Sequence, residues 1–233
     1  MFKPSPIWQT KTVIAFSLIM AVLFLLYRDS VSANERLSCV LDGILKKYKE
    51  FPGLAVEYQR EIITKSMGML GDQVKSDIAS GHFLFKPPHY LKVLQDKPVR
   101  EVITTDGQTI WWFIIEKRIV YEYPADKLGR ELRLLSDIFQ GLSDVNDSFD
   151  AELTESGSDT EYHLNLVPKK PWEEIDHIEL YVDLNFFIRV VEIHNFLGSV
   201  TRFILGDYLV REDFEKGFFS FVAPDGVEVI KED

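Results

Sequence analysis

The chain of 233 residues has very little cysteine, few basic residues and almost no long apolar segment. Its one cysteine, Cys39, excludes a disulfide within the chain, and its place on the apolar side of a predicted helix indicates a buried free thiol. Lysine and arginine number 26 against 37 aspartates and glutamates, which gives a net charge of −11 at pH 7. This balance argues against nucleic acid and anionic membrane surfaces as partners.

Sequence signatures of catalysis and of metal binding are also missing. The histidines are scattered along the sequence and form no H-E-x-x-H motif, and one cysteine cannot form a CxxC metal site. No G-x-S-x-G, G-x-G-x-x-G or phosphate-binding loop occurs. We therefore expect no enzyme activity, no cofactor and no metal. A secreted enzyme whose site is too dispersed to detect remains the alternative from another class.

One apolar run stands at the N-terminus, over residues 13–27, and its 15 residues are fewer than the roughly 20 of a membrane-spanning helix. Lys3 and Lys11 precede it, and the small residues Ser32 and Ala33 follow it. This order predicts a signal peptide over residues 1–33, cleaved after Ala33. An uncleaved N-terminal anchor is the alternative. In both cases residues 34–233 leave the cytoplasm as one domain.

The rest of the chain predicts a fold that is mainly β with some α. An apolar stripe at helical spacing predicts a helix over residues 35–51, and a second one predicts a helix over 128–139. Between and after them, short alternating or apolar runs separated by Gly, Pro and Asn predict roughly eleven antiparallel strands. The expected strands are 54–64, 76–86, 89–95, 99–105, 109–115, 119–123, 149–155, 161–167, 177–183, 187–196, 199–209 and 218–221.

The strand over residues 109–115 is apolar on both faces. Ile110, Trp112 and Ile114 point one way, whereas the alternate residues Trp111 and Phe113 point the other. An antiparallel strand with one wet face should instead alternate apolar and polar residues. Both faces must therefore be covered, either by the chain's own elements or by an apolar ligand that the protein binds.

Four segments, in this order, resemble the LolA family, the periplasmic carriers of outer-membrane lipoproteins. They are Gly81–Val93 with its central prolines, the hairpin Thr104–Phe113 with Asp106-Gly107, the tripeptide Leu166-Val167-Pro168, and the finish Phe219–Val229. The resemblance covers essentially all of residues 34–230.

The resemblance implies an unclosed antiparallel β-barrel of about eleven strands with a helical lid over an apolar cavity. It implies a periplasmic carrier, expected to be a monomer, that shields the acyl chains of lipoproteins on the way from the inner to the outer membrane. The implied partners are acylated lipoproteins, an inner-membrane release complex and an outer-membrane acceptor. The family usually has an arginine directly before the strand-breaking proline, thought to hold the lid closed, and here Pro87 stands in that place.

On this basis we expect an apolar cavity wall formed by Phe83, Phe85, Tyr90, Leu91, Val93, Trp111 and Phe113. The lid would consist of Leu37, Leu41 and Ile44 in the first helix and Leu135, Ile138 and Phe139 in the second. Trp112 and Ile114 would replace Trp111 and Phe113 if the opposite face of their strand points inward. A lipid- or lipoprotein-binding sensor, a glycolipid carrier, and a purely structural envelope protein with these residues in its plain core are alternatives.

Overall fold

The computed structural model describes residues 34–64, 77–125, 130–143, 145–154, 160–172 and 175–232, without the side chains of residues 130–133. The chain divides into two compact units, residues 1–39 and 40–233, and the description below concerns the second. The predicted signal peptide, residues 1–33, lies outside the described residues. None of the helices within the described ranges has both the length and the apolar character that crossing a bilayer requires.

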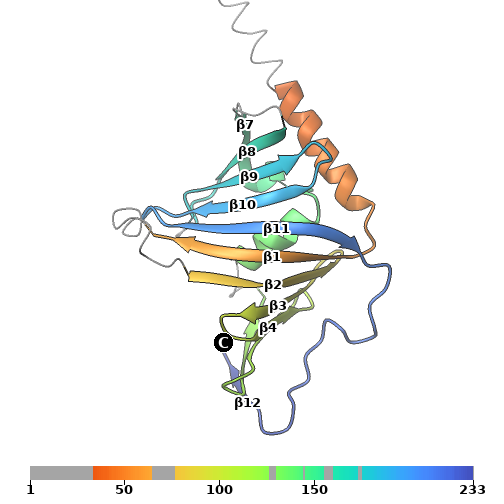
Figure 1. Ribbon diagram of the computed structural model, residues 1–233, viewed down its shortest axis with the longest axis vertical. Helices are drawn as coiled ribbons and strands as arrows, with labels where there is room; N and C mark the ends of the chain where they lie inside the picture. The colour runs from red at the N-terminus through yellow and green to blue at the C-terminus, as the bar shows by residue number, and fades with distance from the viewer. Residues whose placement is uncertain are drawn as a thin grey trace, which may run out of the picture. The chain divides into compact units, whose positions relative to one another are not determined.

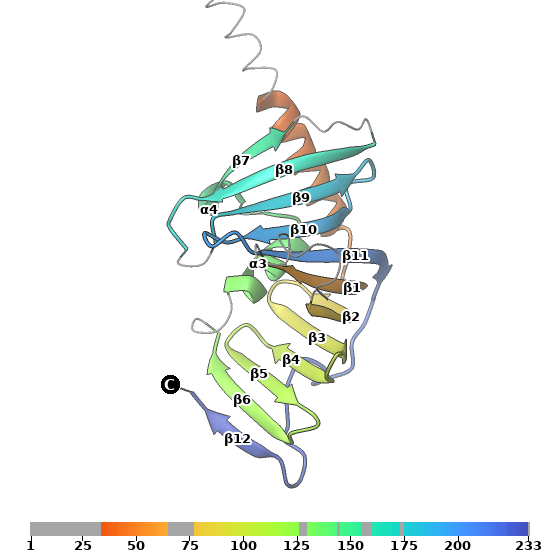
Figure 2. The ribbon, with the colours of Figure 1, turned by 60° about the vertical axis from the view of Figure 1, so that its left-hand side comes forward.

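The described residues of the second unit form one twelve-stranded sheet in the order β12-β6-β5-β4-β3-β2-β1-β11-β10-β9-β8-β7 (Figures 1 and 2). Every neighbouring pair is antiparallel except β12 and β6, which are parallel. The two edge strands do not pair with each other, so the sheet is not closed, which confirms the expected fold class. The strands are β1 Leu54–Ile63, β2 Asp77–Lys86, β3 Tyr90–Lys97, β4 Glu101–Thr105, β5 Thr109–Ile114, β6 Ile119–Pro124, β7 Phe149–Thr154, β8 Glu161–Pro168, β9 His177–Asp183, β10 Ile188–His194, β11 Val200–Val210 and β12 Glu228–Lys231.

One face of this sheet, which we call the inner face, carries most of the core. Residues directly opposite each other on neighbouring strands point to the same side, so the register shows which residues share this face. Leu180 on β9 stands opposite Leu164 on β8 and Val191 on β10, and none of the three is exposed. Val56 on β1 stands opposite Phe83 on β2, and each is 1% exposed. The apolar positions thus recur every second residue along the strands, as the sheet period requires.

Helix α3, Arg130–Phe139, lies against the inner face (Figure 2). The topology explains why: β6 and β7 follow each other in sequence but lie near opposite edges of the sheet, so the connection between them must cross it. Four residues of α3 are buried at helical spacing, Leu134, Leu135, Ile138 and Phe139. The helix stops before Gly141, whose positive φ of 71° glycine adopts without strain. The short helix α4, Val145–Ser148, leads into β7.

A helix over residues 34–49 precedes β1. In the second unit it buries Val40, Ile44 and Tyr48, which are spaced by four and share one side of the helix. The Ile188 amide donates a 3.1 Å hydrogen bond to the Tyr48 hydroxyl, which ties the helix to β10. Cys39 is exposed, so the expected buried thiol is wrong. Cys39 is one residue before Val40, about 100° around the helix from the buried side.

The opposite side of the sheet, which we call the outer face, is partly covered by the segment 211–227. This segment leaves β11 in the middle of the sheet and ends at β12 on its edge (Figure 1). Phe214, Phe218 and Phe219 form a cluster with ring centroids 4.9 to 5.1 Å apart. The strand predicted over 218–221 is wrong, because this stretch consists of turns and irregular backbone whose rings pack on the sheet instead of pairing with it.

Candidate functional site

The centre of the inner face is an apolar wall built from β2 and β3. Phe83 stands opposite Val93, and Phe85 stands opposite Leu91, so all four side chains point the same way. Phe83, Phe85 and Leu91 are 1% exposed and Val93 is 6% exposed. Tyr58 from β1 stacks on Phe83 with ring centroids 4.2 Å apart. The structure therefore brings together four of the seven residues expected for a cavity wall.

Helix α3 covers this wall through the ring of Phe139. The Phe139 centroid lies 5.5 Å from that of Phe83 and 5.8 Å from that of Phe85. Leu135 and Ile138 are also buried, so the three lid residues expected in α3 all lie in the interior. The element that crosses the sheet thus closes the wall.

The helix over 34–49 has a different neighbourhood. Its residue Tyr48 makes ring contacts with Phe187 and Tyr208, at the end of the sheet formed by β9 to β11. Of the lid residues expected here, Ile44 is buried, Leu41 is half-buried, and Leu37, also half-buried, belongs to the first unit. This helix comes close to the chain just after α3, where a Cβ added to Gly141 would lie 2.9 Å from Leu45 Cα and 3.0 Å from Tyr48 Cβ.

The register places the remaining three expected wall residues on the outer face. Leu91 stands opposite Thr105 on β4, and Thr105 stands opposite Ile110 on β5. Ile110, Trp112 and Ile114 therefore point inward, and the alternate residues Trp111 and Phe113 point outward. Tyr90, adjacent to Leu91, also points outward and is 37% exposed. The assignment of Tyr90, Trp111 and Phe113 to the wall is wrong, because both sides of these strands are apolar in sequence and only the pairing distinguishes them.

The chain's own segment 211–227 partly covers two of these outward residues, Tyr90 and Phe113. The ring of Phe113 lies 5.5 Å from that of Phe221, and the ring of Tyr90 lies 5.5 Å from that of Phe219. Lys92 donates a 3.0 Å hydrogen bond from Nζ to the Phe218 carbonyl. Burial lowers the pKa of the Lys92 ammonium, since it disfavours the charged form. The chain itself thus partly covers the apolar outer side of β5, where Trp111 and Phe113 are half-buried.

Beyond the wall, the inner face carries an aromatic row, which we define as Trp112, Tyr121 and Tyr123. Trp112 stands opposite Tyr121, and their ring centroids are 5.7 Å apart, while Tyr121 and Tyr123 stack at 6.2 Å. All three are half-buried, unlike the wall under α3. The Trp112 indole donates a 3.0 Å hydrogen bond from Nε1 to Glu101. Tyr121 and Tyr123 were not among the predicted site residues, although their spacing of two on a strand already placed them on one face.

One basic residue faces the same interior. Arg60 stands opposite Phe203 and Ala79, two positions from Tyr58 and therefore on the inner face. Its Nε is buried and has no hydrogen-bond partner among the described residues. Burial raises the pKa of the neighbouring Tyr58 to about 12, with Arg60 opposing the shift. The site is an apolar surface with one guanidinium nitrogen left to donate, which suits an acyl chain attached to a carbonyl group.

Residues 68–222 match the family model described as outer membrane lipoprotein carrier protein LolA. An outer-membrane lipoprotein carrier protein from Nitrosomonas europaea is 22% identical over 222 residues, covering 95% of this chain and 100% of the relative. One from Nitrosospira multiformis is 27% identical over 193 residues, covering 82% of this chain and 88% of the relative. An uncharacterized conserved protein from Thermus thermophilus shares the fold with a TM-score of 0.53 at 11% identity, covering 86% of this chain and 99% of that chain.

Proposed function

The chain belongs to the LolA family of outer-membrane lipoprotein carrier proteins, and from this premise we propose that it binds lipoproteins by their acyl chains and shields them in the periplasm between the inner and outer membranes. The observation that carries the proposal is the packing of Phe139 of α3 on Phe83 and Phe85 in the middle of an unclosed sheet. An acyl chain can replace α3 on such a wall, because both present apolar groups to it.

The energetics favour this exchange. A sixteen-carbon acyl chain gains about 12 kcal/mol when it leaves water, at about 0.8 kcal/mol per CH₂. Displacing α3 exposes four buried side chains, Leu134, Leu135, Ile138 and Phe139, at about 1.5–3 kcal/mol each, or about 6–12 kcal/mol together. One bound chain is therefore sufficient to offset the loss of the lid contacts. The lid contacts return when the chain departs, so they also favour release.

The aromatic row supplies a surface that an acyl chain can reach next to the covered wall. Trp112, Tyr121 and Tyr123 are half-buried without the lid moving. A chain lying on them would extend toward Phe85 and Phe83 as α3 withdraws, and a cargo carbonyl would accept the free hydrogen bond of Arg60. These residues extend the wall in place of Tyr90, Trp111 and Phe113.

The lid needs no arginine at the position of Pro87. Pro87 lies in an exposed turn between β2 and β3, whereas Phe139 contacts the wall directly. We therefore propose that apolar packing holds the lid closed. Residues 1–33 would act as a cleaved signal peptide, and residues 34–233 would receive cargo from an inner-membrane complex and deliver it to an outer-membrane acceptor.

Two adjacent tryptophans give a matched test. Trp112→Ala removes part of the aromatic row on the inner face, and Trp111→Ala removes the same side chain from the outer face. We expect Trp112→Ala to weaken binding of a synthetic dipalmitoylated lipopeptide at least about tenfold, equivalent to about 1.4 kcal/mol. Trp111→Ala should leave the affinity of the folded protein unchanged. Isothermal titration calorimetry below the lipopeptide's micelle concentration measures both, and circular dichroism checks folding.

Two results would count against the proposal. The first is that the folded wild-type protein binds no lipopeptide. The second is that both tryptophan substitutions weaken binding equally, because the inner face would then not be the site.

A further inference from the structure

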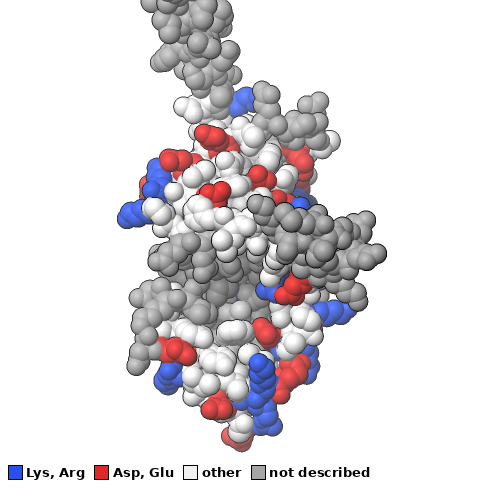
Figure 3. All heavy atoms as spheres, turned by 90° about the vertical axis from the view of Figure 1, so that its left-hand side faces the viewer, with Lys and Arg blue, Asp and Glu red and all other residues white. Residues whose placement is uncertain are grey.

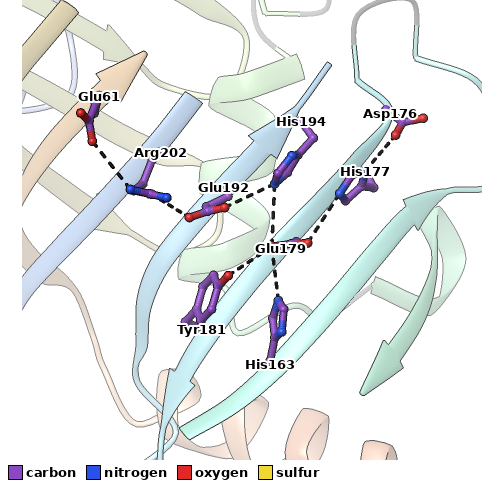
Figure 4. Close-up of polar contacts among 9 residues, drawn as sticks. All are labelled: Glu61, His163, Asp176, His177, Glu179, Tyr181, Glu192, His194 and Arg202. Atoms are coloured by element: carbon purple, nitrogen blue, oxygen red, sulfur yellow. Dashed lines mark hydrogen bonds and ion pairs between the residues drawn. The ribbon is translucent and has the colours of Figure 1, made fainter. Parts of the chain in front are cut away.

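Three of the histidines that are scattered in sequence meet on the outer face of β8, β9 and β10 (Figure 4). His177 and Glu179 are two residues apart on β9 and therefore point to the same side. His194 on β10 stands opposite His177, and His163 on β8 stands opposite Tyr181. The register places the Glu179 carboxylate among three imidazole rings.

The distances between the Glu179 oxygens and the three imidazole nitrogens are too long for hydrogen bonds. Nε2 of His163 lies 3.4 Å, and Nε2 of His194 lies 3.8 Å, from Oε2 of Glu179, while Nε2 of His177 lies 3.7 Å from Oε1. Hydrogen bonds from nitrogen to oxygen span about 2.7–3.2 Å. Neighbouring ligand atoms of a tetrahedral zinc ion, with bonds of about 2.0–2.1 Å, lie about 3.3–3.4 Å apart. The 3.7 and 3.8 Å distances from His177 and His194 to Glu179 would therefore shorten by a few tenths of an ångström around such an ion. The His177, Glu179 and His194 ligand atoms also lie within 4.8 Å of one another.

Two of these nitrogens make no hydrogen bond to a described residue, although Nε2 of His194 also lies 3.4 Å from Oε2 of Glu192. Nε2 of His163 and Nε2 of His194 are buried and have no hydrogen-bond partner among the described residues. Burying a polar atom without a partner costs free energy. A cation bound at Glu179 would accept the lone pair of Nε2 of His194.

The surroundings hold the ligand groups in position. Nδ1 of His177 lies 2.8 Å from Oδ2 of Asp176, which leaves Nε2 to face Glu179. A carboxylate on the far nitrogen is the usual partner of a metal-binding histidine, because it fixes the tautomer and the ring orientation. The rings of His177 and His194 stack with centroids 4.2 Å apart, and Tyr181 donates a 3.2 Å hydrogen bond to Glu179.

The charges around Glu179 and Glu192 differ in a way that favours a cation at Glu179. Glu192 has a fixed partner, since Nε of Arg202 lies 2.6 Å from its Oε1. Within the described part of the chain, no lysine or arginine nitrogen lies within 4 Å of the Glu179 carboxylate, which is 24% exposed. A divalent ion would supply the missing positive charge.

We propose that His177, Glu179 and His194 bind one divalent transition-metal ion of the zinc class, with Asp176 as a positioning residue for His177. Two imidazoles and one carboxylate form a ligand set that zinc accepts, leaving a fourth position for water. His163 on β8 would contact Oε2 of Glu179. The site links β9 to β10 on the face opposite the proposed lipid surface, so it would act independently of lipoprotein binding.

Metal titration of the purified, chelator-treated protein tests this proposal. We expect one Zn²⁺ per chain by calorimetry, and Co²⁺ should give the intense visible absorption of a tetrahedral site that Zn²⁺ then abolishes. His194→Ala and Glu179→Gln should each lower the affinity at least about tenfold, and Asp176→Asn should lower it about 10–100-fold. Glu179→Gln keeps the side-chain shape, so it decides the test if His194→Ala fails to fold by circular dichroism.

His82→Ala is the matched control. His82 also lies on the outer face, between Glu57 and Asp96 at 3.6 Å each, but it has no second histidine beside it. Its substitution should leave Zn²⁺ binding unchanged. The proposal is overturned if no saturable one-to-one binding occurs, if His82→Ala abolishes binding as well, or if the three histidines respond to pH but not to Zn²⁺ in their NMR spectra, as an ordinary ion-pair network would.

Discussion

Tyr58 illustrates how a single side chain serves both the core and the proposed lipid surface. Its ring stacks on Phe83 and lies 6.2 Å from Phe203, and the residue is 5% exposed. Burial disfavours the phenolate and raises the pKa of the hydroxyl to about 12. The same aromatic cluster that an acyl chain would meet therefore makes the fold sensitive to alkaline pH.

Replacing Tyr58 with phenylalanine tests this coupling. The pKa in the folded state, about 12, exceeds the unfolded value of about 10, so the stabilisation is complete below pH 10 and is lost as the pH rises toward 12. Phenylalanine cannot ionise. Between pH 10 and pH 12, the unfolding free energy of the Tyr58→Phe variant should therefore fall by up to about 2 kcal/mol less than that of the wild type. Urea unfolding at pH 9 and pH 11.5 measures the difference. Parallel pH profiles for both proteins would contradict the assignment.

Helix α3 is the element on which the proposed exchange depends. It crosses the sheet between β6 and β7, and its apolar side faces the wall that it would vacate. Gly141 sets how closely the end of this crossing approaches the helix over 34–49: a Cβ here would lie 2.9 Å from Leu45 Cα and 3.0 Å from Tyr48 Cβ. Its φ is also positive, at 71°.

Gly141→Ala should therefore loosen the lid. The positive φ costs about 1–2 kcal/mol, and the collision with Leu45 adds to it. We expect lower stability in urea and faster association with the dipalmitoylated lipopeptide in stopped-flow fluorescence. Gly217→Ala is the control, since Gly217 has a φ of 86° but only the Ser220 side chain, 3.3 Å away, near its added Cβ. If both variants bind at the same rate, the lid does not limit binding.

The segment 211–227, which has no regular structure, covers apolar side chains on the outer face as α3 does on the inner face. It covers Tyr90 and Phe113 through Phe219 and Phe221, and Arg118 donates hydrogen bonds to the carbonyls of Asp225 and Gly226. This explains how β5 can be apolar on both sides. One side belongs to the proposed lipid surface, and the other is partly covered by the protein itself.

At the scale of the whole molecule, the negative net charge permits binding of an acyl chain but disfavours adsorption to an anionic membrane surface. The net charge is −11, and the face in Figure 3 intersperses acidic and basic side chains. An apolar surface on such a protein can take up an acyl chain, while long-range repulsion disfavours adsorption to an anionic bilayer.

We therefore expect no salt-dependent adsorption to anionic vesicles. In co-sedimentation at about 10 mM ionic strength, where the Debye length is about 30 Å, binding to phosphatidylglycerol vesicles should not exceed binding to phosphatidylcholine vesicles. Zwitterionic vesicles are thus the internal control. Adsorption to the anionic vesicles that disappears at 0.15 M salt would show that a local basic surface outweighs the net charge.

The sequence by itself determined most of the elements and the family, although it did not predict α4 or the edge strand β12. The period of the apolar residues placed β9 at His177–Asp183 and predicted α3 over 128–139, close to its actual extent of Arg130–Phe139. The turn around Gly107, with its φ of 90°, was also evident, because few residues other than glycine adopt that conformation. These features depend on residues that are neighbours along the chain.

Only the tertiary structure decided which face of β5 points inward, how the phenylalanines of 211–227 are used, and that His163, His177 and His194 share one surface. Periodicity shows that a strand has two faces, but where both are apolar, as at Trp111 and Trp112, it cannot say which one the helix covers. That choice, and the meeting of side chains from different strands, depends on the register between segments far apart in sequence.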